Sequence, residues 1–158
     1  MERICLFPGT FDPVTLGHTD IIDRALPLFD KLVIGIGRNV NKQPMFSEKQ
    51  RLEWLIDIYQ GNPKVEALFY EGLTVECCKT IGAKFILRGI RYVNDFEYEK
   101  AIADMNRSIE NVETIFLTCL PQYTSVASTL VRDVLKNGGD VSKFLPSVVN
   151  ETISKMKS

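Results

Sequence analysis

The sequence has 158 residues, a length that favours one domain with an adequate hydrophobic core, so we expect a single domain over residues 1–158. Its 45% hydrophobic and 25% charged residues are typical of a globular protein, and no apolar run is long enough to span a bilayer, so we expect no membrane partner. The net charge of −1 gives no electrostatic reason to expect a nucleic-acid partner.

The four cysteines, at positions 5, 77, 78 and 119, show neither a CxxC pair nor the spacing of metal ligands. With one histidine in the chain, a structural zinc site is not expected, and we predict buried, reduced thiols. The first predicted strand begins near residue 3, which leaves no room for a signal peptide. We therefore expect a cytoplasmic protein.

The first polar segment follows an apolar run at residues 4–7. This run is short and is bounded by a proline and a glycine, so it predicts a buried strand. From Gly17 onward apolar residues recur at helical spacing, so a helix is predicted to open near His18. The first N–H groups of a helix lack partners and carry partial positive charge, and Thr10, Thr15 and His18 add side-chain donors. We predict a phosphate-binding site here; the alternative is an ordinary strand-to-helix turn.

Four further strands are predicted, at residues 32–37, 65–70, 84–87 and 114–120. Helices alternate with them and follow them, with predicted N-termini at Ser47, Leu73, Asn94, Ser125 and Pro146. This alternation predicts an α/β fold, a Rossmann-like five-stranded parallel sheet with helices on both faces. The sequence has no GxGxxG motif, so it gives little support to a dinucleotide-binding domain.

Apolar spacing also predicts which helix residues share a face. In the helix capped by Asn94 these are Tyr98, Ile102, Met105 and Ile109. In the last helix we expect Val149, Ile153 and Met156 to point inward.

The polar segments follow the carboxyl ends of predicted strands, where parallel sheets bind ligands. Residues 10–18 follow the first strand, Lys42 the second, Arg88 and Arg91 the fourth, and residues 123–129 the fifth. We expect them to converge on one crevice that is rich in phosphate donors and lacks a protein nucleophile. Such a site suits a reaction in which a substrate phosphate attacks the α-phosphorus of a nucleoside triphosphate.

Each position also has an ordinary alternative interpretation. These are a solvated lysine at 42, a surface turn at 88–91, N-capping residues at 123–129, a solvated glutamate at 99, and a turn-forming residue rather than a metal ligand at Asp12.

The string PGTFDPVTLGH (8–18) resembles the signature of the nucleotidyltransferase superfamily that carries the (H/T)xGH motif, with His18 as the motif histidine. Four other strings extend the similarity: KQPMF (42–46), ILRGIRYVNDFEYE (86–99) with MNR (105–107), SVASTLVR (125–132) and GDVSKFLP (139–146). Together they resemble the bacterial phosphopantetheine adenylyltransferases from end to end. The RGIR and DFEYE segments separate this family from other members of the superfamily.

The resemblance implies transfer of AMP from ATP to 4′-phosphopantetheine, giving dephospho-coenzyme A and pyrophosphate. Mg2+ would act with ATP and take no ligand from protein side chains. The resemblance also implies a homohexamer and coenzyme A as a feedback ligand at the active site.

Roles for individual residues follow from the same resemblance. It implies catalytic roles for His18, Lys42 and Arg91, and contact with phosphopantetheine for Thr10, Lys42, Thr74 and Arg88. The implied ATP-binding residues are Thr10, Phe11, His18, Gly89, Ile90, Arg91, Glu99, Tyr123, Thr124, Ser125, Val126, Ala127, Ser128 and Thr129.

Two positions depart from the family pattern or vary within it. Ala127 replaces the first residue of a usual run of serines and cannot donate a hydrogen bond, and Thr74 lies where family members differ. Two rival functions remain open. One is a nucleotidyltransferase that uses nicotinamide mononucleotide or a polyol phosphate as acceptor, and the other is a catalytically silent sensor of ATP or coenzyme A.

Overall fold

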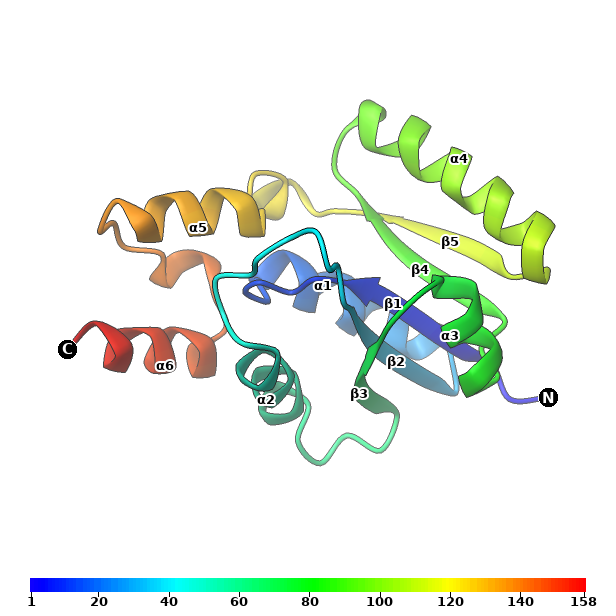
Figure 1. The fold of residues 1–158 in the computed structure, drawn as a ribbon, viewed down its shortest axis with the longest axis horizontal. Helices are drawn as coiled ribbons and strands as arrows, with labels where there is room; N and C mark the ends of the chain where they lie inside the picture. The colour runs from blue at the N-terminus through cyan, green and yellow to red at the C-terminus, as the bar shows by residue number, and fades with distance from the viewer.

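A computed structural model describes all residues from 1 to 158, and its five strands form one parallel sheet in the order β3-β2-β1-β4-β5 (Figure 1). The strands are β1 (Ile4–Gly9), β2 (Lys31–Gly37), β3 (Val65–Tyr70), β4 (Phe85–Ile90) and β5 (Glu113–Thr118). The predicted five-stranded parallel sheet is confirmed. The chain moves outward from β1 to β3 and then returns to β4 on the other side of β1, so the strand order reverses between β1 and β4.

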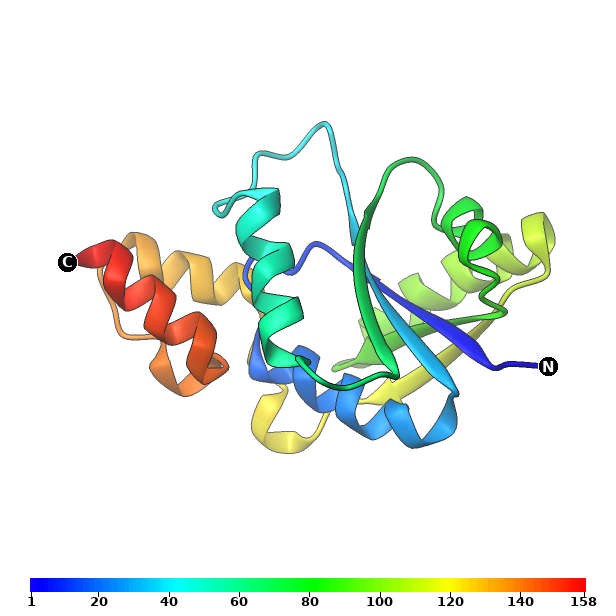
Figure 2. The same ribbon diagram turned by 90° about the horizontal axis from the view of Figure 1, so that it is seen from below.

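Four helices connect the strands and two follow the sheet. They are α1 (Leu16–Ala25), α2 (Glu48–Ile58), α3 (Thr74–Ile81), α4 (Val93–Glu110), α5 (Ser128–Lys136) and α6 (Ser147–Lys157). The view in Figure 2 shows α5 and α6 lying beyond one end of the sheet, where α6 contacts α2. None of these helices is both long enough and apolar enough to cross a bilayer.

Side chains of β1 alternate between two buried clusters, as the period of a strand requires. Cys5 and Phe7 belong to the larger cluster, which contains residues of α1, α2 and α6, whereas Leu6 belongs to a smaller cluster with Cys77 and Cys78 of α3. Both faces of β1 are therefore covered, and the prediction of helices on both faces of the sheet is confirmed. All four cysteine thiols are free, but only three are buried as predicted, because Cys119 is partly exposed.

Several predicted boundaries differ from the structure. Strand β1 does not end before Pro8 but continues through it to Gly9. Three further differences lie near the crevice. Strand β4 continues to Ile90, so Arg88 is a strand residue. Helix α4 begins at Val93 rather than after Asn94, because the Asp95 carboxylate accepts the main-chain N–H groups of residues 91 and 92, each at 3.1 Å. Helix α5 begins at Ser128 rather than 125, because a 3₁₀ turn at 121–123 takes up the preceding residues.

Two predictions about which helix residues face the core are also wrong in part. Met156 does not point inward but is 56% exposed, while Val149 and Ile153 are buried as predicted. Helix α4 has no buried residue at all, and its predicted apolar face is open to solvent, with Tyr98 70% and Met105 65% exposed. No other element of the chain covers this face.

Candidate active site

A cavity of about 760 Å³ opens at the carboxyl ends of β1, β2 and β4, where the strand order reverses. A second cavity of about 680 Å³ adjoins it and shares Thr10, Arg88 and Glu99 with it. The predicted convergence on one crevice is thus confirmed for most of the predicted residues. Those that line the first cavity are Thr10, Phe11, His18, Lys42, Arg88, Gly89, Arg91, Glu99, Val126, Ala127, Ser128 and Thr129.

Five predicted site residues lie outside the first cavity. Thr74 lines the second cavity, where its hydroxyl lies 3.0 Å from the Tyr70 hydroxyl. Ile90 and residues 123–125 line neither cavity. Residues 123–125 belong to the turn before α5.

His18 lies in the first turn of α1 and has a defined tautomer. The main-chain N–H of Thr15 donates to its Nδ1 at 3.0 Å, and the Thr15 hydroxyl lies 3.1 Å from the same nitrogen. Because Nδ1 accepts, the proton of the neutral ring is on Nε2, which is free to donate a hydrogen bond. The Phe11 ring packs 4.9 Å from the imidazole between ring centroids, and Phe11 takes a left-handed backbone conformation with φ of 50°.

The charge of His18 follows from its surroundings. Burial lowers the pKa of His18 to about 4, and the positive charges of Arg91 and Arg88 contribute to the same shift. At neutral pH the ring is therefore uncharged. It can donate from Nε2 to a phosphoryl oxygen, but it does not carry a second proton to transfer.

Arg88 is held in place by Glu99 of α4. Its Nε donates to Glu99 Oε2 at 2.8 Å, its Nη2 to Glu99 Oε1 at 2.5 Å, and its Nη1 to the Pro8 carbonyl oxygen at 2.8 Å. A guanidinium has five N–H groups, so two remain for a ligand. Both oxygens of Glu99 therefore bind Arg88, and the expected contact of Glu99 with ATP stays a prediction.

Lys42 differs from Arg88 because its side chain is exposed and forms no ion pair. It lies in the loop between β2 and α2, close to Arg38. Arg38 pairs with Glu48 at the start of α2, with its Nε 2.7 Å from Oε1 and its Nη2 2.8 Å from Oε2, and it also pairs with Glu71 after β3. Lys42 is thus a mobile charge on a loop that is anchored at its start.

The start of α5 supplies donors from its main chain. Ala127 is the N-cap residue and gives no side-chain cap, so the first N–H groups of the helix have no side-chain partner. The Ser128 hydroxyl donates to the Pro13 carbonyl at 2.8 Å, which ties α5 to the turn after β1. A Cβ atom on Gly17 would lie 3.1 Å from the Val126 carbonyl oxygen, so the close approach of these two segments favours glycine.

Each of the four carboxylates that line the first cavity already has a partner. Asp12 accepts two main-chain N–H groups of residues 45 and 46, Glu48 pairs with Arg38, Asp95 accepts the N–H groups that cap α4, and Glu99 pairs with Arg88. No group of three His, Cys, Asp or Glu side chains is arranged to hold a metal ion.

Sequence reasoning missed three arginines that line the first cavity: Arg38, Arg51 and Arg132. Arg132 lies one helical turn after Ser128, and this i, i+4 spacing would have placed both on one face of α5. Arg51 is 4% exposed, and nothing in its sequence context distinguishes it from an ordinary helix-surface arginine. Asp12 was interpreted as a turn-forming residue, and the structure adds its hydrogen bonds to the loop after β2.

The sequence matches a known family, and the fold matches that of a solved structure. Residues 6–134 match the family model described as Cytidylyltransferase-like, so the chain belongs to that family. The crystal structure of a Vibrio parahaemolyticus protein assigned as a nicotinate-nucleotide adenylyltransferase has the same fold, with a TM-score of 0.67 and 21% identity over 97% of this chain and 99% of that chain.

Closer relatives define the family more narrowly. A phosphopantetheine adenylyltransferase of Flavobacterium psychrophilum is 49% identical over 147 residues, covering 93% of this chain and 97% of the relative. That of Bacteroides thetaiotaomicron is 45% identical over 91% of this chain and 95% of the relative, and that of Lachnoclostridium phytofermentans is 41% identical over 96% and 93%. The chain belongs to the phosphopantetheine adenylyltransferases.

The state of His18 can be measured directly because it is the one histidine in the chain. We expect its NMR signals to show a neutral ring protonated on Nε2 at pH 7, with a titration midpoint near pH 4 rather than 6.5. Arg91→Met removes one positive charge and should raise the midpoint. Because the folded pKa lies below the unfolded value, the contribution of His18 to the free energy of unfolding is complete above about pH 6.5 and declines as the pH falls toward 4. A wild-type midpoint near 6.5 would contradict the assignment.

Proposed function

We propose that this protein transfers AMP from ATP to 4′-phosphopantetheine, producing dephospho-coenzyme A and pyrophosphate. The observation that carries the proposal is the neutral His18 donor beside Arg88 and Arg91 in the first cavity, in a chain related to phosphopantetheine adenylyltransferases along most of its length. No protein atom needs to form a covalent bond in this reaction, because the acceptor phosphate is the nucleophile.

In the proposed step a phosphate oxygen of the acceptor attacks the α-phosphorus of ATP. A new P–O bond forms on one side of the phosphorus, and the bond to the bridging oxygen of pyrophosphate breaks on the other. The protein aligns the two groups and stabilises the charge on the equatorial oxygens. We assign hydrogen-bond donation to the α-phosphate to Nε2 of His18, and charge neutralisation to Lys42 and Arg91.

The two cavities suggest how the substrates divide the site. The acceptor phosphate would lie where the two cavities meet, near Thr10 and Arg88, within reach of Lys42 in the first cavity. Its pantetheine arm would extend into the second cavity past Thr74. ATP occupies the rest of the first cavity, between the end of β4 and the start of α5. The proposed ATP contacts are Phe11, His18, Gly89, Arg91, Val126, Ala127, Ser128 and Thr129, while contacts of Ile90, Glu99, Tyr123, Thr124 and Ser125 with ATP stay predictions.

We propose that Mg2+ enters with ATP, bound by the phosphates. It would reduce the negative charge of the triphosphate before the acceptor approaches. The support is that the carboxylates of Asp12, Glu48, Asp95 and Glu99 are all engaged by other groups. Chelation of Mg2+ during an assay of pyrophosphate release tests whether the reaction requires the metal.

Three further expectations concern regulation, assembly and location. Coenzyme A contains the same pantetheine arm as the acceptor, so we propose that it competes for the second cavity. The uncovered apolar face of α4 supports assembly of several copies, for which we propose a hexamer that light scattering can test. We propose a cytoplasmic location.

The reaction is tested by pyrophosphate release from ATP and Mg2+ with 4′-phosphopantetheine and nicotinamide mononucleotide supplied in parallel. We expect release with phosphopantetheine only. Release with nicotinamide mononucleotide only would still support transfer of AMP from ATP, but it would show that the acceptor is not phosphopantetheine. Binding of ATP without release in either case would indicate a sensor.

His18→Ala should lower kcat far more than it weakens ATP binding. The Nε2 donor acts on charge that develops in the transition state, and loss of one such donor typically costs ~2.7–4 kcal/mol, about 10²–10³ in kcat. We expect the Kd of ATP, measured by calorimetry, to change by less than about threefold. Equal losses in kcat and in ATP affinity would show that His18 binds the ground state.

Glu99→Gln should weaken the binding of the acceptor rather than the binding of ATP. Glutamine keeps the size of the side chain but loses its charge and one of the two oxygens that hold Arg88. We expect the KM for phosphopantetheine to rise about tenfold, ~1.4 kcal/mol, with the KM for ATP nearly unchanged. Glu97→Gln, an exposed glutamate on the same helix, is the matched control. A rise confined to the KM for ATP would show that Glu99 acts in ATP binding and not in acceptor binding.

A further inference from the structure

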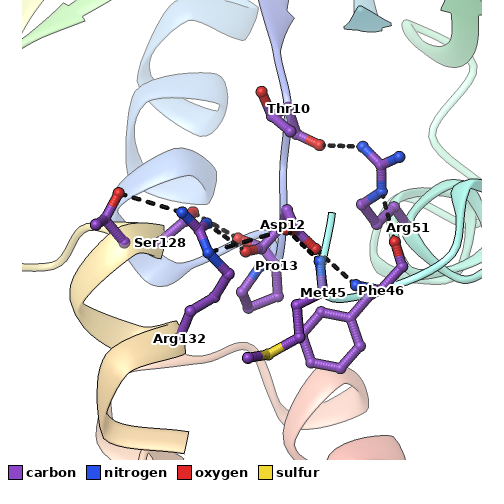
Figure 3. Close-up of polar contacts among 9 residues, drawn as sticks. Thr10, Asp12, Pro13, Met45, Phe46, Arg51, Ser128 and Arg132 are labelled. Atoms are coloured by element: carbon purple, nitrogen blue, oxygen red, sulfur yellow. Dashed lines mark hydrogen bonds and ion pairs between the residues drawn. The ribbon is translucent and has the colours of Figure 1, made fainter. Parts of the chain in front are cut away.

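Asp12 forms a buried connection between the turn after β1 and the loop after β2 (Figure 3). Its side chain is 3% exposed, its Oδ2 accepts the Met45 N–H at 2.8 Å, and its Oδ1 accepts the Phe46 N–H at 2.9 Å. A carboxylate that accepts two main-chain N–H groups forms charge-assisted hydrogen bonds, which are stronger than neutral ones. Asp12 therefore binds the end of the loop firmly to the turn.

Arg51 of α2 reinforces the same connection from the other side. Its Nη1 donates to the Thr10 carbonyl oxygen at 2.7 Å and its Nε donates to the Phe46 carbonyl oxygen at 3.1 Å (Figure 3). The N–H of Phe46 thus meets the Asp12 carboxylate while its carbonyl meets Arg51. Both polar groups of one loop residue are held by buried charged side chains.

Lys42 lies three residues before this anchored end of the loop. The other end is anchored where Arg38 pairs with Glu48 and Glu71. Between the two anchors the Lys42 side chain is exposed and forms no ion pair. The position that its ammonium group can reach is consequently set by the anchors and not by a partner of its own.

The same aspartate also contacts α5. Arg132 Nη1 donates to the Asp12 carbonyl oxygen at 2.8 Å, and its Nε lies 3.9 Å from Asp12 Oδ2. Three segments that line the first cavity therefore meet at one residue: the turn after β1, the loop that carries Lys42, and the start of α5.

We propose that Asp12 is a positioning residue for the transfer reaction and acts through Lys42. Its carboxylate holds the Lys42 loop at the distance from Thr10 and His18 that lets the ammonium group meet the acceptor phosphate. The proposal rests on the role of Lys42 given under the proposed function. A purely structural role for Asp12 would instead reduce stability without a selective effect on one substrate.

Asp12→Asn separates these roles with little change in size. The amide has one acceptor oxygen, and its NH2 group faces a main-chain N–H, so either Met45 or Phe46 loses its partner. The contact of Arg132 with the Asp12 carbonyl is retained, so the binding of ATP near α5 should be affected least. We expect the KM for phosphopantetheine to rise about tenfold and the KM for ATP to change by less than about twofold.

A double-mutant cycle with Lys42→Ala provides the decisive measurement. If Asp12 acts through Lys42, adding Asp12→Asn to Lys42→Ala changes the KM for phosphopantetheine by less than about twofold. Asp140→Asn is the matched control, because Asp140 also accepts a main-chain N–H, that of Ser142 at 2.9 Å, and lines neither cavity. It should leave both KM values unchanged.

Independent effects of the two substitutions, or an unchanged KM for phosphopantetheine in Asp12→Asn, would overturn the proposal. If Asp12→Asn does not fold, Arg51→Lys is used in the same cycle, since lysine keeps the charge but cannot bridge the carbonyls of Thr10 and Phe46. If Lys42→Ala itself leaves the KM for phosphopantetheine unchanged, the acceptor role of Lys42 and this proposal are both wrong. Pyrophosphate release by the wild-type protein would still support the proposed reaction in that case.

Discussion

Bringing two phosphorylated substrates together requires positive charge at one place, because like charges repel strongly when they leave bulk water. The chain has a net charge of −1, so this charge has to be concentrated locally. The parallel sheet meets the requirement by ending its strands at one edge, where Arg88, Arg91 and Lys42 line one cavity. Burial is the main reason why His18 is neutral, and the same concentration of charge adds to the effect, since protonating it beside two arginines would increase the repulsion.

A neutral histidine has a further requirement, because only one of its tautomers donates toward the cavity. The Thr15 N–H selects that tautomer by occupying Nδ1, and it can do so because Thr15 is the N-cap of α1. The N–H groups at a helix start are thus used in two ways in this protein. One orients the histidine, while those of α5 remain available to an anion.

The fold could be predicted from the sequence because strands and helices alternate with clear periodicity, and the buried runs of β1 and β2 are nearly continuous. Many of the cavity residues could be predicted because they follow strand ends and match a known motif, whereas Arg51 and Arg132 lie in helices and were missed. The role of Asp12 could not, because it depends on hydrogen bonds to residues 33 and 34 positions away, and a sequence pattern next to proline shows only a turn. The boundary of α4 was missed because its capping carboxylate, Asp95, lies inside the helix and follows a tyrosine that is not a usual N-cap residue.

Helix α4 links the acceptor site to the surface of the molecule. Its residues Glu99, Ala103 and Asn106 line the second cavity, and Glu99 orients Arg88. Yet none of its residues is buried, so within one chain little apolar packing holds this wall of the cavity in place. A second copy that covered the exposed apolar face would restrict the motion of α4 and, through Glu99, that of Arg88. In the proposed assembly, contact between copies would therefore contribute to acceptor binding without any residue crossing into a neighbouring site.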